Sequence, residues 1–204
     1  MRIGIIGIGC LTLELAFRSV VSGFEVVIYH PRGSRLMGDI IEKMGSKAQC
    51  GSLAEVCSAE LVLLFAPKQD LQELIQNMPD MSGKTIVHTS GLIFDPQSLL
   101  SGIINAMTYK TTASMLPKAH VVKLFNPVQL NPNASPFRER GREEIFFIAE
   151  NKEAGNCAAV FLRKLNFAPI DLAGRLHLHG AAASQKMSIG PLWTDPFKNR
   201  RNKY

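Results

Sequence analysis

The sequence predicts an α/β protein with a Rossmann-type, doubly wound and mostly parallel sheet that carries helices on both faces. Three observations predict it. The chain begins with a short β-branched apolar run, residues 2–6, that leads into a G-x-G turn. Apolar runs of strand length then alternate with segments of helical periodicity. Residues 61–66 are almost continuously apolar, as expected for a strand buried on both faces of a parallel sheet.

The first thirty residues predict one β-α-β unit around which the rest is organised. Apolar residues at helical spacing predict a helix that ends at Ser22 and Gly23, and residues 24–29 predict a second strand. The turn between strand and helix would bind a dinucleotide pyrophosphate at the helix N-terminus. The alternative is a glycine-rich turn that binds nothing. The predicted contact residues of this turn are Gly7, Ile8, Gly9, Cys10 and Leu11.

The third position of the G-x-G-x-x-G pattern holds Thr12 in place of glycine. Because this position governs how closely the helix packs on the strand, we expect the threonine to shift the helix slightly outward. We expect the site itself to be retained.

The segment after the second strand favours NADP over NAD. NAD-binding proteins place an acid there for the ribose 2′-hydroxyl, whereas a 2′-phosphate needs a cation. No acid occurs between Glu25 and Asp39. The predicted contacts to the phosphate or the adenine are His30, Arg32, Ser34 and Arg35. A solvated loop is the alternative for these side chains.

The composition is that of an ordinary globular protein. The 204 residues are 46% hydrophobic and 20% charged, and the sequence shows neither a membrane-length apolar run nor a signal peptide. We therefore expect a cytoplasmic protein with no membrane partner. The net charge of +6 lies partly in residues 198–203, and no nucleic-acid motif accompanies it. We expect no nucleic-acid partner.

The cysteines predict neither disulfides nor a metal site. They show no C-x-x-C pair, so we expect free thiols that are mostly buried. His177 and His179 alternate but have no third ligand at a fitting distance, so no metal is predicted. The four cysteines are Cys10, Cys50, Cys57 and Cys157.

Further elements follow in two β-α-β-α-β halves. Strands are predicted over residues 47–50, 61–66, 85–88, 121–125, 144–149 and 168–172. Helices are predicted over residues 33–44, 52–57, 69–78, 96–101, 111–116, 152–165 and 174–187, and a loop over 126–142.

The chain divides into residues 1–172, the dinucleotide-binding domain, and residues 173–204, a C-terminal helix and basic tail. We expect residues 174–193 to form a homodimer contact, because the run of three alanines would let another helix approach closely. The alternative is that this helix packs on its own sheet.

Residues at the carboxyl ends of other strands complete the predicted site, since ligands of such sheets bind at this edge. Ala66 and Pro67 would form an apolar edge under a ribose, although Pro67 also suits a helix start. The hydroxyls of Thr89 and Ser90 would lie near the nicotinamide. Asn126 would bind the carboxamide or a substrate carbonyl, or it is a turn residue.

Several of these segments resemble the deazaflavin-dependent NADP oxidoreductases. They are residues 3–16, the His30-Pro31-Arg32-Gly33 turn, residues 61–67, Thr89-Ser90 and the run Val121-Val122-Lys123-Leu124-Phe125-Asn126. The chain is also similar to the NADPH-binding domain of the six-transmembrane epithelial metalloreductases, including residues 166–171. The resemblance covers about residues 2–172 and implies an NADP(H)-dependent oxidoreductase.

By this resemblance the enzyme would transfer a hydride between NADP(H) and a flavin-like or deazaflavin acceptor, which needs no side-chain proton donor. One alternative is a reductase of a small carbonyl or imine, like pyrroline-carboxylate reductase or the β-hydroxyacid dehydrogenases. Those enzymes carry a long helical C-terminal domain that this chain is expected to lack. Another is a non-catalytic NADP-binding regulator. No catalytic residue is assigned, and His88 is expected to be a core residue.

Overall fold

The computed structural model describes residues 1–31, 33, 37–94, 99–127, 142–149 and 151–173. Residues Met1–Ala173 form one compact unit, and Gly174–Tyr204 are a second unit that lies outside the described residues. The predicted helix 174–187 and the predicted dimer contact of residues 174–193 therefore lie outside them too. Within the described ranges, no helix is both long and apolar enough to cross a membrane.

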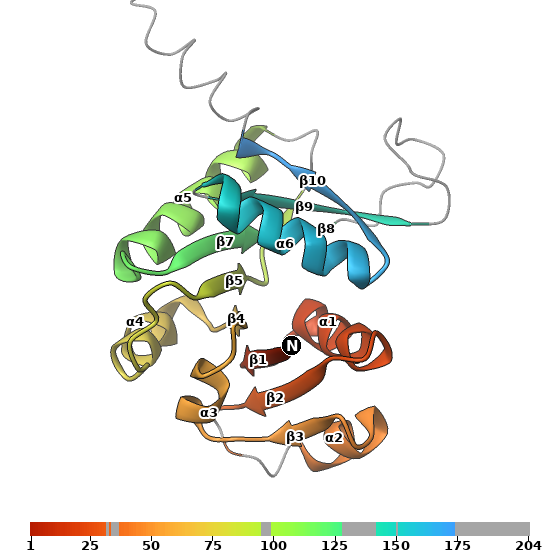
Figure 1. Ribbon diagram of the computed structural model, residues 1–204. Coiled ribbons are helices and arrows are strands. Elements are labelled where there is room, and N and C mark those ends of the chain that lie inside the picture. Colours follow the sequence, from red (N-terminus) through yellow and green to blue (C-terminus); the bar gives the residue numbers. More distant parts are fainter. Residues whose placement is uncertain (32, 34–36, 95–98, 128–141, 150, 174–204) are drawn as a thin grey trace, which may run out of the picture. The chain divides into compact units, whose positions relative to one another are not determined.

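Strands and helices alternate along this unit (Figure 1). The strands are β1 (Arg2–Ile6), β2 (Glu25–Tyr29), β3 (Ala48–Cys50), β4 (Leu61–Phe65), β5 (Thr85–Thr89), β6 (Ile93–Phe94), β7 (His120–Leu124), β8 (Asn126–Pro127), β9 (Glu143–Ala149) and β10 (Phe167–Asp171). The helices are α1 (Cys10–Val21), α2 (Gly38–Met44), α3 (Leu53–Cys57), α4 (Lys68–Gln76), α5 (Leu99–Met115) and α6 (Lys152–Lys164).

Eight strands form one sheet in the order β10-β9-β7-β5-β4-β1-β2-β3. All neighbours are parallel except β7 and β9, which pair antiparallel. Strand β1 pairs with β2 on one side and β4 on the other, so the strand order reverses there. The predicted Rossmann-type fold is confirmed, and its ligand crevice is expected at the carboxyl ends of β1 and β4.

Helices cover both faces of the sheet (Figure 1). Alternate residues of each strand enter opposite cores: Ile5 of β1 belongs to one core and Ile6 to the other. The first core packs α1, α2 and α6 against the sheet, and the second packs α3, α4 and α5. Because both faces are buried, the central strands are apolar almost throughout.

Helix α5 differs from the prediction of two short helices over 96–101 and 111–116. One helix spans Leu99–Met115. Its threonines weakened the helical pattern, but in the structure they bond to the helix backbone: Thr108 Oγ1 donates to the carbonyl of Ile104, and Thr112 Oγ1 to that of Thr108. Polar side chains that bond within the helix therefore hid its continuity.

Three other predictions need correction or fall partly outside the described residues. The predicted helix 33–44 is observed only over Gly38–Met44, and residues 32 and 34–36 lie outside the described part. In the predicted loop 126–142, β8 pairs with β6 in a separate two-stranded sheet, and residues 128–141 are not described. All four cysteines are free, but Cys10 and Cys50 are exposed, so the expectation of mostly buried thiols is wrong for these two.

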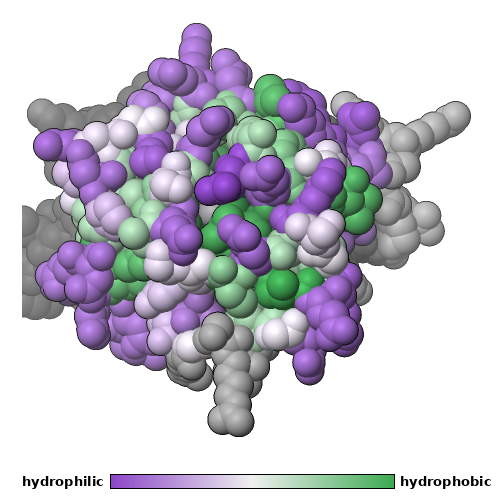
Figure 2. All heavy atoms as spheres, turned by 60° about the horizontal axis from the view of Figure 1, so that its bottom comes forward, coloured by the Kyte–Doolittle hydropathy of each residue, from purple (hydrophilic) through white to green (hydrophobic). Residues whose placement is uncertain are grey.

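Figure 2 shows the surface of the unit turned so that the bottom of Figure 1 comes forward. There, hydrophilic side chains surround small, separated apolar patches (Figure 2). Scattered apolar residues are normal on the surface of a globular protein.

Helix α6 allows a test of the first core. Phe161 is 2% exposed and packs against Phe24 with ring centroids 6.0 Å apart, whereas Val160 is 51% exposed. We expect Phe161→Ala to lower the free energy of unfolding by about 3 to 5 kcal/mol because it leaves a cavity. Val160→Ala, the matched control on the same helix, should change it by less than about 0.5 kcal/mol. Urea unfolding measures both, and equal effects would contradict this packing.

Candidate functional site

The turn after β1 lies directly against the end of β4. Gly7 has φ +74°, and a Cβ at this position would collide with the backbone carbonyl oxygen of Phe65. The Gly7 N–H also donates to the Tyr29 carbonyl at 2.8 Å, which ties the turn to the end of β2. Only glycine meets both the left-handed conformation and the close approach.

Gly9 is required for a different reason. A Cβ there would lie 2.8 Å from Cζ of the Phe65 ring. Thr12 is fully buried, and its hydroxyl accepts from the Gly9 N–H at 2.8 Å and donates to the Gly9 carbonyl at 3.1 Å. The threonine thus fastens the turn to the first turn of α1. The predicted outward shift of the helix stays a prediction.

The N-terminus of α1 supplies the amides that an anion would bind. Cys10 is the first residue of α1 and Leu11 the second. The first amides of a helix have no intrahelical acceptor, and the helix dipole favours negative charge there. Because Thr12 already engages the Gly9 N–H, the amides of Cys10 and Leu11 are the ones that would face a pyrophosphate.

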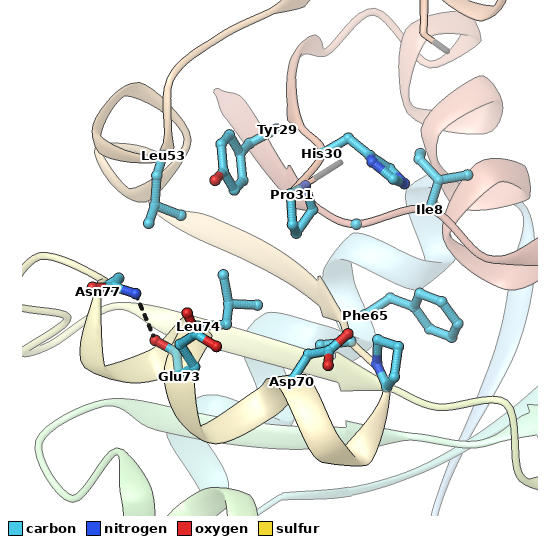
Figure 3. A pocket seen from close by; sticks show the side chains of 13 residues that line it. Ile8, Tyr29, His30, Pro31, Leu53, Phe65, Asp70, Glu73, Leu74 and Asn77 are labelled. Atoms are coloured by element: carbon cyan, nitrogen blue, oxygen red, sulfur yellow. Dashed lines mark hydrogen bonds between the residues drawn. The ribbon is translucent and has the colours of Figure 1, made fainter. Parts of the chain in front are cut away.

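A cavity of about 410 Å³ opens beside this turn (Figure 3). Tyr29, His30 and Pro31 lie on one side, and residues of α4 lie on the opposite side. The lining residues are Gly7, Ile8, Tyr29, His30, Pro31, Leu53, Phe65, Ala66, Pro67, Asp70, Glu73, Leu74 and Asn77. The cavity therefore joins the ends of β1, β2 and β4, at the point where the strand order reverses.

The structure brings together part of the predicted site. Five predicted residues line the cavity, Gly9 caps the adjoining helix α1, and Cys10 and Leu11 begin it. The predicted roles of Arg32, Ser34 and Arg35 fall outside the described residues, as does the side chain of Asn126. The five cavity residues are Gly7, Ile8, His30, Ala66 and Pro67.

The α4 wall was not predicted. Asp70, Glu73 and Asn77 are exposed, and Leu74 is buried beside them. The spacing of three and four residues places them on one helix face, which is the signal that sequence reasoning missed. Ionised carboxylates only accept hydrogen bonds, so this wall suits a donor such as the amino group of a base. A phosphate would be repelled from it.

A buried polar cluster lies farther along the same sheet edge. The Lys123 side chain is 0% exposed, and its Nζ donates to Ser90 Oγ at 2.6 Å. His88, the register partner of Lys123 on β5, is 2% exposed, and its Nδ1 lies 2.8 Å from Thr112 Oγ1. Thr89 is fully buried, and its hydroxyl donates to the Leu64 carbonyl at 3.4 Å. Of the two predicted hydroxyls, only that of the half-buried Ser90 reaches the edge.

Burial shifts both titratable groups of this cluster toward neutrality. Desolvation lowers the pKa of Lys123 from 10.5 to about 7. Desolvation, with a smaller contribution from the charge of Lys123, lowers the pKa of His88 from 6.5 to about 3. His88 is therefore neutral at physiological pH and holds no proton to donate as an imidazolium.

Comparison with known proteins adds sequence evidence. Residues 2–91 match the family model described as "NADP oxidoreductase coenzyme F420-dependent". Over 196 residues the chain is 26% identical to the metalloreductase STEAP3 of Rattus norvegicus, covering 96% of this chain but only 38% of the rat protein. The predicted family resemblance is confirmed. An NADP-dependent oxidoreductase is the enzyme class that these matches indicate.

Solved structures share the fold. The hypothetical protein SMa0349 from Sinorhizobium meliloti gives a TM-score of 0.66 at 24% identity over 84% of each chain. A putative F420-dependent NADP-reductase from Arthrobacter sp. FB24 gives 0.59 at 20% identity, over 90% of this chain and 95% of that one. An imine reductase from Pseudomonas sp. gives 0.57 at 17% identity, over 89% of this chain and 62% of that one.

We expect a second substitution at Phe65 to restore stability after Gly9→Ala but not after Gly7→Ala. Gly9→Ala should lower the free energy of unfolding by about 1 to 3 kcal/mol, since its Cβ meets a side chain. The added change Phe65→Leu should recover much of this loss. Gly7→Ala should not be rescued by Phe65→Leu, because its conflict is with the Phe65 backbone and its own φ. Thermal unfolding of the four variants checks this, and equal rescue of both glycines would contradict it.

Proposed function

We propose that this chain is an NADP(H)-dependent oxidoreductase that transfers a hydride between NADP(H) and a flavin-like or deazaflavin acceptor. The observation that carries the proposal is the glycine turn at the switch point, with the cavity on one side of it and a polar edge on the other. The family match to residues 2–91 supports the deazaflavin acceptor.

In this proposal the cofactor lies along the carboxyl ends of the parallel strands. The adenosine occupies the cavity, with its amino group toward Asp70 or Glu73 and a ribose against Ala66 and Pro67. The pyrophosphate binds the amides at the start of α1. The 2′-phosphate is directed away from the acidic wall, toward residues 32–35. The nicotinamide then lies over the ends of β4, β5 and β7.

Hydride transfer to such an acceptor requires positioning above all. When bound, the nicotinamide would supply or accept the hydride, and the residues at the strand ends would orient it and limit the access of water. Reduction of a carbonyl or an imine would also need a side-chain acid. His88 is unsuited to that role, because it is buried, bonded to Thr112 and neutral. Reduction of a carbonyl or an imine would therefore need an acid other than His88.

A non-catalytic NADP-binding regulator is the remaining alternative. It predicts tight NADPH binding with no oxidation of NADPH by any acceptor. Following NADPH absorbance with a flavin, a deazaflavin and a panel of imines and ketones separates the three functions. Oxidation with a deazaflavin or flavin alone is expected.

The preference for NADP is expected to reside in the loop after β2. Arg32→Ala combined with Arg35→Ala should weaken NADP binding by about 1.5 to 3 kcal/mol, the size of lost charge-assisted hydrogen bonds, and leave NAD binding nearly unchanged. Isothermal titration of both cofactors measures this. Arg163→Ala, an exposed arginine on α6, is the control for a general loss of positive charge. Equal loss for NADP and NAD would reject the assignment.

The acceptor side is expected to depend on Asn126. Asn126→Ala should lower turnover at saturating NADPH, because the residue follows β7 at the edge where the nicotinamide and acceptor meet. His88→Ala should reduce stability and leave turnover unchanged. Steady-state rates measured over pH, together with thermal unfolding, distinguish the two. Unchanged turnover in the Asn126 variant, with a pH profile lost in the His88 variant, would favour the carbonyl or imine reductase.

A further inference from the structure

Lys123 is an unusual residue for a central strand. It lies in β7 between β5 and β9, with a side chain that is 0% exposed. Its Nζ bonds to the neutral hydroxyl of Ser90, and no ion pair in the described part of the chain involves it. Burying an amine in this way is costly. An apolar side chain would fill this position without the cost of burying an amine, as Val122 and Leu124 do at the neighbouring positions.

We propose that Lys123 gives the cofactor site a preference for NADPH over NADP⁺. The two forms differ by one positive charge, which the oxidised nicotinamide ring carries and the reduced ring does not. A lysine ammonium one hydrogen bond below that ring disfavours the oxidised form and leaves the reduced form unaffected. The inference rests on the proposed function, since it needs the nicotinamide to bind at this edge.

The sheet topology supports this placement of the nicotinamide. The cavity for the adenosine lies at the ends of β1, β2 and β4, on one side of the switch point. A dinucleotide that crosses the glycine turn must place its other half over the ends of β4, β5 and β7. Ser90 follows β5 at this edge and is half buried. It thus separates the Lys123 ammonium from the expected ring by a single hydroxyl.

The charge effect is large enough to measure. Two unit charges roughly 8 Å apart, at an effective dielectric constant of about 20, repel each other by about 2 kcal/mol, which corresponds to about a 30-fold change in a dissociation constant; screening by salt reduces this toward tenfold. The site should therefore bind NADPH on the order of tenfold more tightly than NADP⁺ when Lys123 is charged. Release of the oxidised product would be favoured as a consequence.

The preference should change with pH, because burial lowers the pKa of Lys123 to about 7. Below this pH the lysine is charged and repels the oxidised ring, and above it the repulsion is lost. NADP⁺ binding should therefore tighten relative to NADPH binding as the pH rises. The 2′-phosphate is common to both forms of the cofactor, so the ratio of the two dissociation constants cancels its effect.

The other titratable groups near Lys123 would not produce this pH dependence of the cofactor preference. On β5 its register partner is His88, whose pKa of about 3 keeps it neutral. On β9 its partner is Ile148, and Glu144 lies farther along the same face. Helix α5 contributes Tyr109, which is partly buried against the second core, and Lys110, which is exposed. Of these groups, Lys123 is the one expected to titrate near neutrality and lie next to Ser90.

The test measures the dissociation constants of NADPH and NADP⁺ from about pH 6 to about pH 9 by isothermal titration. It compares the wild type, Lys123→Met and the control Lys118→Met, which removes an exposed lysine just before β7. The wild type and the control should prefer NADPH roughly tenfold at low pH and approach parity at high pH. Lys123→Met should bind both forms about equally throughout.

Each outcome decides the proposal. A pH-independent ratio in the wild type, or an unchanged ratio in Lys123→Met, would overturn it while leaving the proposed function intact. Failure of the folded wild type to bind either cofactor would overturn the proposed function and this inference with it. If Lys123→Met does not fold, the wild-type titration decides alone, and Ser90→Ala, which keeps the charge, should retain the pH-dependent ratio.

Discussion

The contact between the glycine turn and the end of β4 is the constraint on which the rest of the site depends. Gly7 has no side chain because the Phe65 carbonyl and a positive φ leave no room for one, and its N–H is held by Tyr29. This contact brings the N-terminus of α1 to the switch point. The cavity beside Phe65 and the amides of α1 are consequences of it.

The charged side chains on the two sides of the glycine turn differ in sign. On one side, the α4 wall carries Asp70 and Glu73, which suit the amino group of a base and repel phosphates. On the other side lies Lys123, whose Nζ donates to Ser90 Oγ and which is positively charged below about pH 7. A dinucleotide with a base at one end and a redox-active ring at the other would meet opposite charges at its two ends. The acidic wall is the part of this pattern that supports placing the base in the cavity.

Most of the fold was predictable from the sequence because each central strand is buried on both faces and reads as an apolar run. Local polarity caused the main error: α5 contains threonines whose hydroxyls bond to its own backbone, so its periodicity is weak. The glycine turn was predictable from its spacing. The shared face of the α4 residues could be inferred from their spacing, but not that this face borders the site, because that depends on β4 pairing beside β1. Lys123 could be noticed in the sequence because it is a lysine inside the otherwise apolar run of residues 121–125.

The central claim is that a dinucleotide crosses the sheet edge at the glycine turn, and it can be tested without knowing the acceptor. In nitrogen-15 labelled protein titrated with NADPH, the account predicts saturating amide shifts at Gly7, Cys10 and Leu11, and at Tyr29 and Ser90 on either side of the turn. Amides of α6, which packs against one face of the sheet, should not shift. Saturating shifts confined to α6 and β10, with the turn unchanged, would contradict it.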